Sequence, residues 1–203
     1  SSDVCSSDLI AVFGSASRIS ETTPERPQTY YGSSKLKADK ELVAMNDREF
    51  KAAIIRPPMA YGGGMAPGNM LRLIRLVNKH IPLPFGSARN SRDFINVKNL
   101  VEFIHLAVEK EVEGVFYPTD KVPYSTRNVV EEISRQLGVH TINLPSPSIF
   151  LKLIEKVRPD LYQKLWGDVV IDRQLALSAI GYEPRYTLED GIREMVESFK
   201  RQK

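Results

Sequence analysis

The chain opens with a strand–helix–strand pattern, and this order limits its fold more than any other feature. An apolar run at residues 10–14 ends at a glycine, a polar loop with two prolines follows, and residues 30–46 are typical of a helix. A second apolar run, residues 51–56, ends at two prolines, which cannot donate to a sheet ladder. Both runs are continuous rather than alternating, which favours parallel strands covered on both faces. We therefore expect an α/β fold with a doubly wound parallel sheet.

The rest of the chain predicts further elements of both kinds. Expected helices lie at 69–79, 99–110 and 127–137, with a short one after Asp172 that Gly181 closes and a last one after Thr187; expected strands lie at 94–97 and 114–117. Ser125 or Thr126 can cap the helix that Gly138 ends. Thr187 and Asp190 have the spacing of a capping box. The pattern predicts one α/β body with a smaller, more helical C-terminal part.

Composition excludes several classes of protein. The 203 residues carry a net charge of +3 that is scattered along the chain, which argues against a nucleic-acid surface. No apolar run approaches the roughly 20 residues that span a bilayer, and no signal peptide is visible. A single cysteine excludes an intrachain disulfide, and the three histidines are dispersed, so we expect no metal site. We expect a cytoplasmic protein without a membrane or nucleic-acid partner.

The first nine residues differ from the rest of the chain. They read SSDVCSSDL, have no apolar period, and match, residue by residue, the translation of a common short-read sequencing adapter. A polar N-terminal tail is the alternative interpretation. We expect residues 1–9 to be non-native, so that native sequence begins at Ile10 and upstream residues of the natural protein are missing.

The sharpest candidate for chemistry is a tyrosine followed four residues later by a lysine. Tyr31 and Lys35 fall on the first turns of the expected helix 30–46, where residues four apart share a face. A phenol is a weak acid, and a nearby ammonium favours its ionised form, so the pair can act as an acid and base. The ammonium can also bind a ribose hydroxyl. The alternative is a surface helix with a solvated lysine.

The surrounding sequence supports the first interpretation. The supporting stretches are IAVFG at 10–14, YGSSK at 31–35, IRPPMAYG at 55–62, GNML at 68–71, PLPFG at 82–86, RDFINV at 92–97 and GYEP at 181–184. By the order and spacing of these stretches, the chain resembles the extended branch of the short-chain dehydrogenase/reductase superfamily, in particular its NAD-dependent epimerase/dehydratase group. The resemblance runs from Ile10 to about Thr187. The resemblance implies a Rossmann-like fold in two regions: the remaining half of a dinucleotide-binding domain at 10–62, with strands returning near 94–117, and a nucleotide-sugar region at 63–203.

The resemblance also implies roles for individual residues. Tyr31 would move the proton at the sugar hydroxyl, Lys35 would tune it and hold the nicotinamide ribose, and Pro58 would line the nicotinamide side of the site. The implied nucleotide-sugar contacts are Asn69 and Arg92 at the diphosphate and Phe85 at the base. A guanidinium fork suits phosphate oxygens, and an aromatic plane suits a base. The alternatives are that Arg92 pairs with Asp93 or Glu102 and that Phe85 is a core residue.

Two features depart from the family pattern. The family's catalytic Ser or Thr would stand at position 9, which is Leu9 here. The glycine-rich loop that binds the pyrophosphate is also absent, because the sequence contains no G-x-x-G-x-x-G. We therefore expect the 203 residues alone to bind dinucleotide weakly and to be inactive.

The resemblance narrows the reaction without naming the sugar. Sugar 4,6-dehydratases carry Asp and Glu where Ile10 and Ala11 stand, so dehydration is disfavoured. What remains is hydride chemistry at one carbon of a nucleotide sugar, UDP-linked by resemblance: 4-epimerisation or reduction of a 4-keto sugar, with NAD as cofactor and NADP as the alternative. The resemblance further implies a homodimer. A non-catalytic scaffold that binds a nucleotide or a partner protein is the competing hypothesis.

Overall fold

The structure, a computed structural model, describes residues 9–47, 50–64, 68–172 and 180–202. The chain forms two compact units. The first consists of three segments, Ser1–Ala60, Asp93–Val122 and Val169–Tyr186, and the second consists of Tyr61–Arg92, Pro123–Asp168 and Thr187–Lys203. The chain therefore leaves the first unit and returns to it twice.

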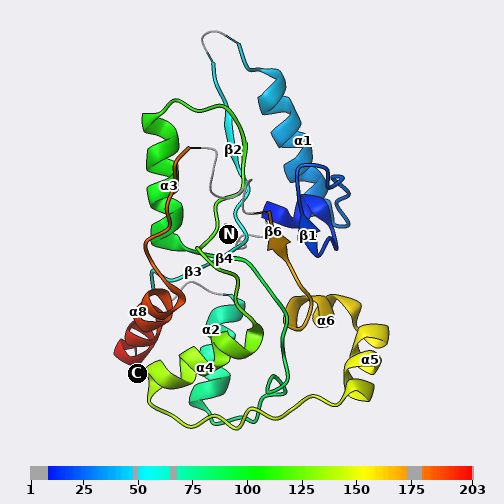
Figure 1. Cartoon of the computed structure of the whole chain (residues 1–203), viewed down its shortest axis with the longest axis vertical. Helices are drawn as coiled ribbons and strands as arrows, with labels where there is room; N and C mark the ends of the chain where they lie inside the picture. Colours follow the sequence, from blue (N-terminus) through cyan, green and yellow to red (C-terminus); the bar gives the residue numbers. More distant parts are fainter. Residues whose placement is uncertain (1–8, 48–49, 65–67, 173–179, 203) are drawn as a thin grey trace. The chain divides into compact units, whose positions relative to one another are not determined.

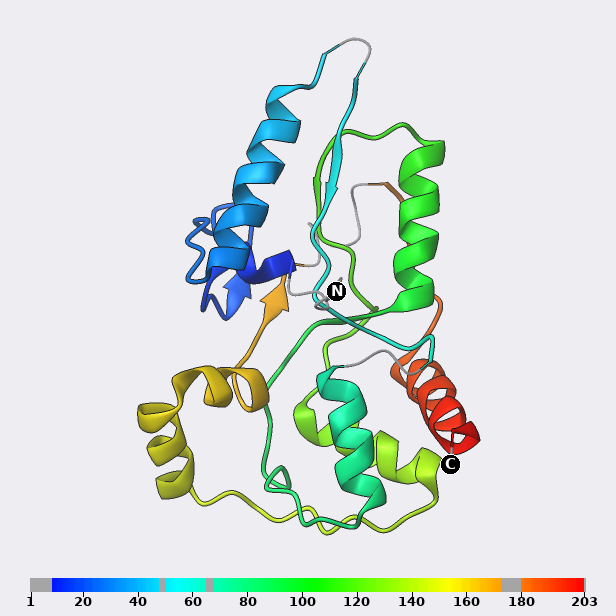
Figure 2. The same cartoon turned by 180° about the vertical axis from the view of Figure 1, so that it is seen from behind.

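The first unit contains short parallel strand pairs flanked by helices. Strand β2 (Ala53–Ile55) pairs in parallel with β5 (Gly114–Phe116), with Ile54 opposite Val115. Helices α1 (Tyr30–Ala44) and α3 (Val97–Glu109) lie on opposite sides of β2 in both views (Figures 1 and 2). Two further pairs are β1 (Arg18–Ile19) with β6 (Val170–Ile171), in parallel, and β3 (Met59–Tyr61) with β4 (Phe94–Asn96). The α/β class with parallel strands is confirmed.

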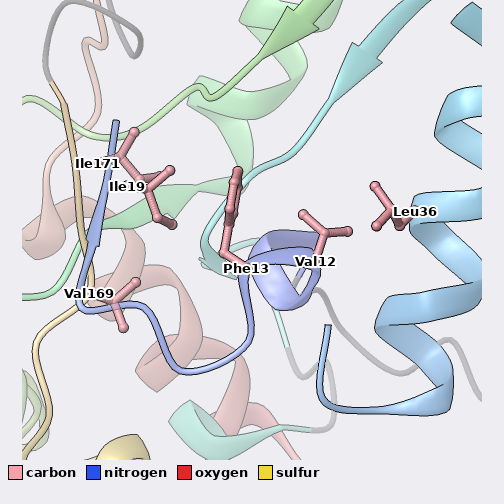
Figure 3. Close-up of a cluster of buried hydrophobic side chains, with 6 residues drawn as sticks. All are labelled: Val12, Phe13, Ile19, Leu36, Val169 and Ile171. Carbon is pink, nitrogen blue, oxygen red and sulfur yellow. The ribbon is translucent and has the colours of Figure 1, made fainter. Parts of the chain in front are cut away.

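Two apolar clusters hold this unit together. In the first, shown in Figure 3, Leu36 reaches from α1 toward Val12, and Phe13, Ile19, Val169 and Ile171 complete the cluster. In the second, Phe103 of α3 packs edge-on against Tyr182 with ring centroids 5.1 Å apart, and Phe116 of β5 lies beside them. Each cluster joins segments from different parts of the sequence, so burial of apolar surface fixes the return of the chain to this unit.

The expected strand at residues 10–14 is wrong. Residues Leu9–Phe13 form a 3₁₀ helix, η1, whose turns continue through local hydrogen bonds from the Gly14 amide to the Ala11 oxygen and from the Ala16 amide to the Phe13 oxygen. Within the described residues, no strand pairs with this segment. A short apolar run without a neighbouring strand satisfies its backbone locally. Its burial was predicted correctly, because Val12 and Phe13 are in the core.

The second unit is mainly helical. It contains α2 (Asn69–Asn78), α4 (Thr126–Leu137), α5 (Ser148–Val157), α6 (Pro159–Leu165) and α8 (Leu188–Arg201). Helix α4 packs against α2 and α8. Ser125 caps α4 in a capping box with Asn128, and Gly138 ends it at φ 71°. The predicted box of Thr187 and Asp190 at α8 is also present.

Other boundaries shift by a few residues or were not anticipated. Helix α3 begins at Val97 because the side chain of Asn96 accepts from the Lys98 amide and caps it earlier than expected. Helices α5 and α6 were not predicted. The short helix expected after Asp172 falls on residues 173–179, which lie outside the described residues.

Candidate functional site

The predicted acid–base pair lies on the first turns of α1, in the first unit. Thr29 caps the helix by accepting from the Gly32 amide at 3.0 Å, which starts the helix directly before the tyrosine. A side chain at position 32 would overlap the Ala11 oxygen and the Pro27 ring, so glycine allows α1 to lie close against η1. Tyr31 is 44% exposed and Lys35 is half-buried one turn later. The spacing therefore places both groups on one helical face at the surface of the unit.

No side chain among the described residues binds the polar group of Tyr31 or of Lys35. Among the described residues, the Tyr31 hydroxyl and the Lys35 ammonium have no hydrogen-bond or ion-pair partner. The acid–base role predicted for this pair stays a prediction. Both polar groups are available to a ligand.

A buried arginine lies close behind the same helix. Arg56, which follows β2, is 3% exposed and binds two carboxylates. Its Nε donates to Asp39 of α1 at 2.9 Å, and its Nη1 donates to Glu25 at 2.8 Å and to the Tyr117 hydroxyl oxygen at 3.2 Å. The guanidinium also lies 5.7 Å from the ring centroid of Phe13. The cluster ties α1, the loop before it, η1 and the end of β5 together.

The cluster shifts two ionisation equilibria. Burial works against the charge of Arg56, but its hydrogen bonds to Glu25 and Asp39 outweigh burial and raise the pKa of the guanidinium. Burial raises the pKa of Tyr117, and the neighbouring charge of Arg56 only partly offsets this. Arg56 therefore stays charged and Tyr117 stays neutral at physiological pH.

The third predicted residue of the first unit is Pro58, which is buried between β2 and β3. It lacks an amide hydrogen and so cannot extend β2. Its role at a nicotinamide ring stays a prediction.

The other three predicted residues belong to the second unit. Arg92 donates through Nη1 to the main-chain oxygens of Gln163, at 2.7 Å, and Gly167, at 2.9 Å. Phe85 is 3% exposed, and its ring centroid lies 5.2 Å from that of Trp166. Both side chains therefore contact the segment 163–167. Asn69 is exposed at the first position of α2.

These contacts show how Arg92 and Phe85 are packed in the second unit. The interpretation of Phe85 as a core residue describes its packing here. Near it, two side-chain donors, Asn143 Nδ2 and Trp166 Nε1, are buried without a partner among the described residues. Asn143 also accepts from the Phe85 amide at 3.0 Å. The sequence analysis did not single out Asn143, Trp166 or Arg56. The only available signal was for Arg56, a cation at the end of an apolar strand.

In the parts of the chain that the structure describes, no group of three or more His, Cys, Asp or Glu side chains is arranged to hold a metal ion. Within the same residues, no helix combines the length and apolar character needed to cross a membrane.

Comparison with known proteins decides the family. Residues 4–117, more than half of the chain, match the model of the NAD dependent epimerase/dehydratase family. The chain belongs to this family. The match begins inside the nine-residue segment that we expected to be non-native. The family assignment made from the sequence motifs is confirmed.

A curated member of the epimerase/dehydratase family is similar over most of the chain. The UDP-glucose 4-epimerase of Vibrio cholerae is 35% identical over 179 residues, which cover 85% of this chain and 54% of that protein. The chain thus spans about half the length of this relative.

Solved structures agree on the fold. The UDP-glucuronic acid 4-epimerase of Bacillus cereus, solved with NAD, superposes with a TM-score of 0.72 at 21% identity, over 94% of this chain and 59% of that one. The UDP-Glc/GlcNAc 4-epimerase of Campylobacter jejuni gives 0.65 at 22% identity, over 94% and 62%. A dTDP-glucose 4,6-dehydratase of Bacillus anthracis gives 0.63 at 20% identity, over 98% and 61%. The expected Rossmann-like fold class is confirmed.

Proposed function

We propose that the natural protein containing residues 10–203, called here the parent protein, is a NAD-dependent UDP-sugar 4-epimerase. The observation that carries this proposal is the 35% identity to a UDP-glucose 4-epimerase, combined with Tyr31 and Lys35 on α1, whose polar groups have no partner among the described residues. A homodimer stays an expectation that rests on the family resemblance, and a cytoplasmic location stays one that rests on the sequence composition. The two-region division at 10–62 and 63–203, into cofactor and substrate parts, is part of the same proposal.

NAD fits the residues of this chain only in part. The ammonium of Lys35, which has no partner in the described part of the chain, suits a ribose hydroxyl at the nicotinamide end, next to Tyr31. The sequence contains no glycine-rich loop for the pyrophosphate. We therefore propose that the 203 residues alone bind dinucleotide weakly and do not turn over. When bound in the parent protein, NAD supplies an acceptor and donor of hydride at one sugar carbon.

The chain's own part of the reaction is proton transfer and binding. The Tyr31 phenolate takes the proton from the sugar 4-hydroxyl as the carbon is oxidised, and the phenol returns it when the carbon is reduced on the other face. Lys35 stabilises the phenolate by its positive charge. Arg92 binds a phosphate oxygen of the UDP group, while Asn69 and Phe85 lie along the nucleotide. Because Arg92 also holds the segment 163–167, its substrate role and its structural role are linked.

The competing reactions differ in what they consume and in the residues that they need. Reduction of a 4-keto sugar uses the same residues but consumes one reduced nicotinamide per turnover. Dehydration needs a carboxylate acid and base, and Ile10 and Ala11 occupy the places where the dehydratases carry theirs. A binding scaffold without turnover remains the alternative, and the lack of a hydroxyl at Leu9 favours it for the chain alone.

A single assay separates these outcomes. The parent protein is incubated with UDP-glucose, UDP-galactose, UDP-glucuronic acid and UDP-N-acetylglucosamine, each with NAD and with NADP, and the sugars are analysed by chromatography. Interconversion of 4-epimers without net change in nicotinamide absorbance supports the proposal. Net reduction of the cofactor with formation of a 4-keto sugar, the reverse of ketoreduction, assigns a reductase. Tight binding of a UDP-sugar with no product under any condition refutes the enzymatic role.

A further inference from the structure

Lys35 has two candidate partners on its own helix face. Tyr31 lies one turn before it and Asp39 one turn after it, and side chains four residues apart on a helix are neighbours. A lysine followed at this spacing by a carboxylate can form an ion pair with it. An ammonium paired in that way is less available to a phenol or to a ribose hydroxyl. The environment of the Asp39 carboxylate therefore determines what Lys35 can do.

The same helix shows what happens at an ordinary position. Lys37 and Glu41, also four residues apart, form an ion pair with 3.9 Å between Nζ and Oε1. Lys35 and Asp39 do not, since Lys35 has no ion-pair partner among the described residues. Sequence spacing alone does not explain this difference, because both pairs have the same spacing and the same order of charges.

Arg56 explains the difference. Its Nε lies 2.9 Å from Oδ2 of Asp39, and both side chains are buried, with 4% of the arginine and 13% of the aspartate side chain exposed. A buried carboxylate bound by a guanidinium keeps that partner, because separating the two leaves two charges without compensation. Arg56 thus takes the carboxylate that would otherwise pair with Lys35.

The other charged groups around α1 do not replace this interaction. Glu25, from the loop before the helix, binds Arg56 at 2.8 Å and Lys40 at 3.9 Å. Tyr117, from the end of β5, is neutral and bonded to Arg56. The element packed on the helix, η1, consists of apolar residues only.

We propose that Arg56 is a positioning residue that, by binding Asp39, keeps the Lys35 ammonium unpaired and available to Tyr31. The use of Lys35 by Tyr31 and by a cofactor ribose rests on the proposed function. The pairing of Arg56 with Asp39, and the lack of an ion pair between Asp39 and Lys35, do not depend on the proposed function.

The test measures how readily the Lys35 amine reacts. The 203-residue chain is treated with a limiting amount of an acetylating reagent, and acetylation at each lysine is followed by mass spectrometry. In Arg56→Gln the carboxylate of Asp39 turns to Lys35, and acetylation of Lys35 slows by about 1.4-fold to 2.3-fold, the size expected for one helical ion pair. In Arg56→Gln/Asp39→Asn the rate returns to that of the unmodified sequence. Arg56→Lys keeps a cation beside Asp39 and preserves the original rate. Lys37 is the internal control and does not change.

Loss of a buried cation can also unfold the chain. For that reason Arg56→Gln is paired with Arg56→Gln/Glu25→Gln, which removes one of the two carboxylates left without a partner. If Lys35 reacts equally fast with and without Arg56, or if Asp39→Asn fails to restore the rate, the inference is overturned. A purely structural role of Arg56 would not produce recovery by the second substitution. The labelling needs no turnover, so a parent protein that proves inactive on UDP-sugars would refute the proposed function and leave this result in place.

Discussion

Arg92 donates a hydrogen bond to the main-chain oxygen of Gly167 at 2.9 Å, across 75 residues of sequence. The same nitrogen reaches the oxygen of Gln163. This contact fixes the end of α6 next to the segment that carries Phe85. A residue proposed to bind a diphosphate therefore also stabilises the second unit in the absence of a ligand.

Replacement of Arg92 separates these two roles. Arg92→Ala in the parent protein is expected to raise KM for a UDP-sugar by about tenfold to a hundredfold, because a charged hydrogen bond to phosphate is lost. Arg92→Lys keeps the charge but not the fork and recovers part of the affinity. Arg89→Ala is the matched control, since Arg89 is exposed three residues earlier. If Arg92→Ala lowers the melting temperature but leaves KM unchanged, its role is structural only.

Tyr31 has a natural control beside it. Tyr31→Phe in the parent protein is expected to lower kcat by about 10² to 10⁴ with little change in KM, because only the proton-transfer group is removed. Tyr30→Phe removes the hydroxyl of a neighbour that is 98% exposed and is expected to have no effect. Steady-state rates of both variants check this, and equal rates for the two would exclude Tyr31 as the acid and base.

The buried charge of Arg56 makes a separate prediction about stability. Arg56→Met strands the carboxylates of Glu25 and Asp39, and the free energy of unfolding of the chain is expected to fall by about 3–5 kcal/mol. Arg26→Met is the control, because Arg26 is exposed in the same loop. Urea denaturation of the two variants measures the difference. A loss no larger than that of the control would mean that the ion pairs add nothing net.

The capping box of α8 predicts a dependence on acid. Hydrogen bonds from the main chain and hydroxyl of Thr187 lower the pKa of Asp190 below its ordinary value of 3.8. The folded state therefore gains stability from this carboxylate above that value and loses it as the pH falls through the lowered pKa. Asp190→Asn removes this contribution, of at most about 0.5 kcal/mol, because solvent screens the group. Melting curves at pH 7 and pH 3 should differ less in this variant than in Glu197→Gln, an exposed control later on α8.

Elements fixed by contacts between residues close in the sequence could be predicted, and elements fixed by contacts between distant residues could not. Caps were predicted well, because Ser125 and Thr187 act on amides within three residues. The continuous apolar run at residues 51–56 was predicted as a parallel strand, but its pairing with β5 was not, because the run at 114–117 was named only as a separate strand. The run at residues 10–14 was predicted as a strand, but Leu9–Phe13 form a 3₁₀ helix, because a strand needs a neighbour that local sequence cannot supply.

At the candidate site the same limit applies. The Tyr31–Lys35 pair could be predicted because helical spacing places both on one face. The Arg56–Asp39 pair could not be predicted, because the two residues are 17 positions apart in the sequence. They meet only when the chain that follows β2 comes to lie against α1. Likewise, the burial of Phe85 against Trp166 depends on a contact that no local pattern encodes.

The interleaved path of the chain limits how this protein can be divided. Because the first unit is assembled from three stretches and the second from the stretches between and after them, no single cut releases either unit intact. Removing the last sixteen or so residues would take away α8, which packs against α4, while leaving every strand of the first unit in the chain. Folding must also bring distant stretches together before either core closes, which is a slow process for a chain of this topology. Neither unit can therefore be exchanged with that of a relative by splicing one contiguous block, because each unit is made of three separate segments.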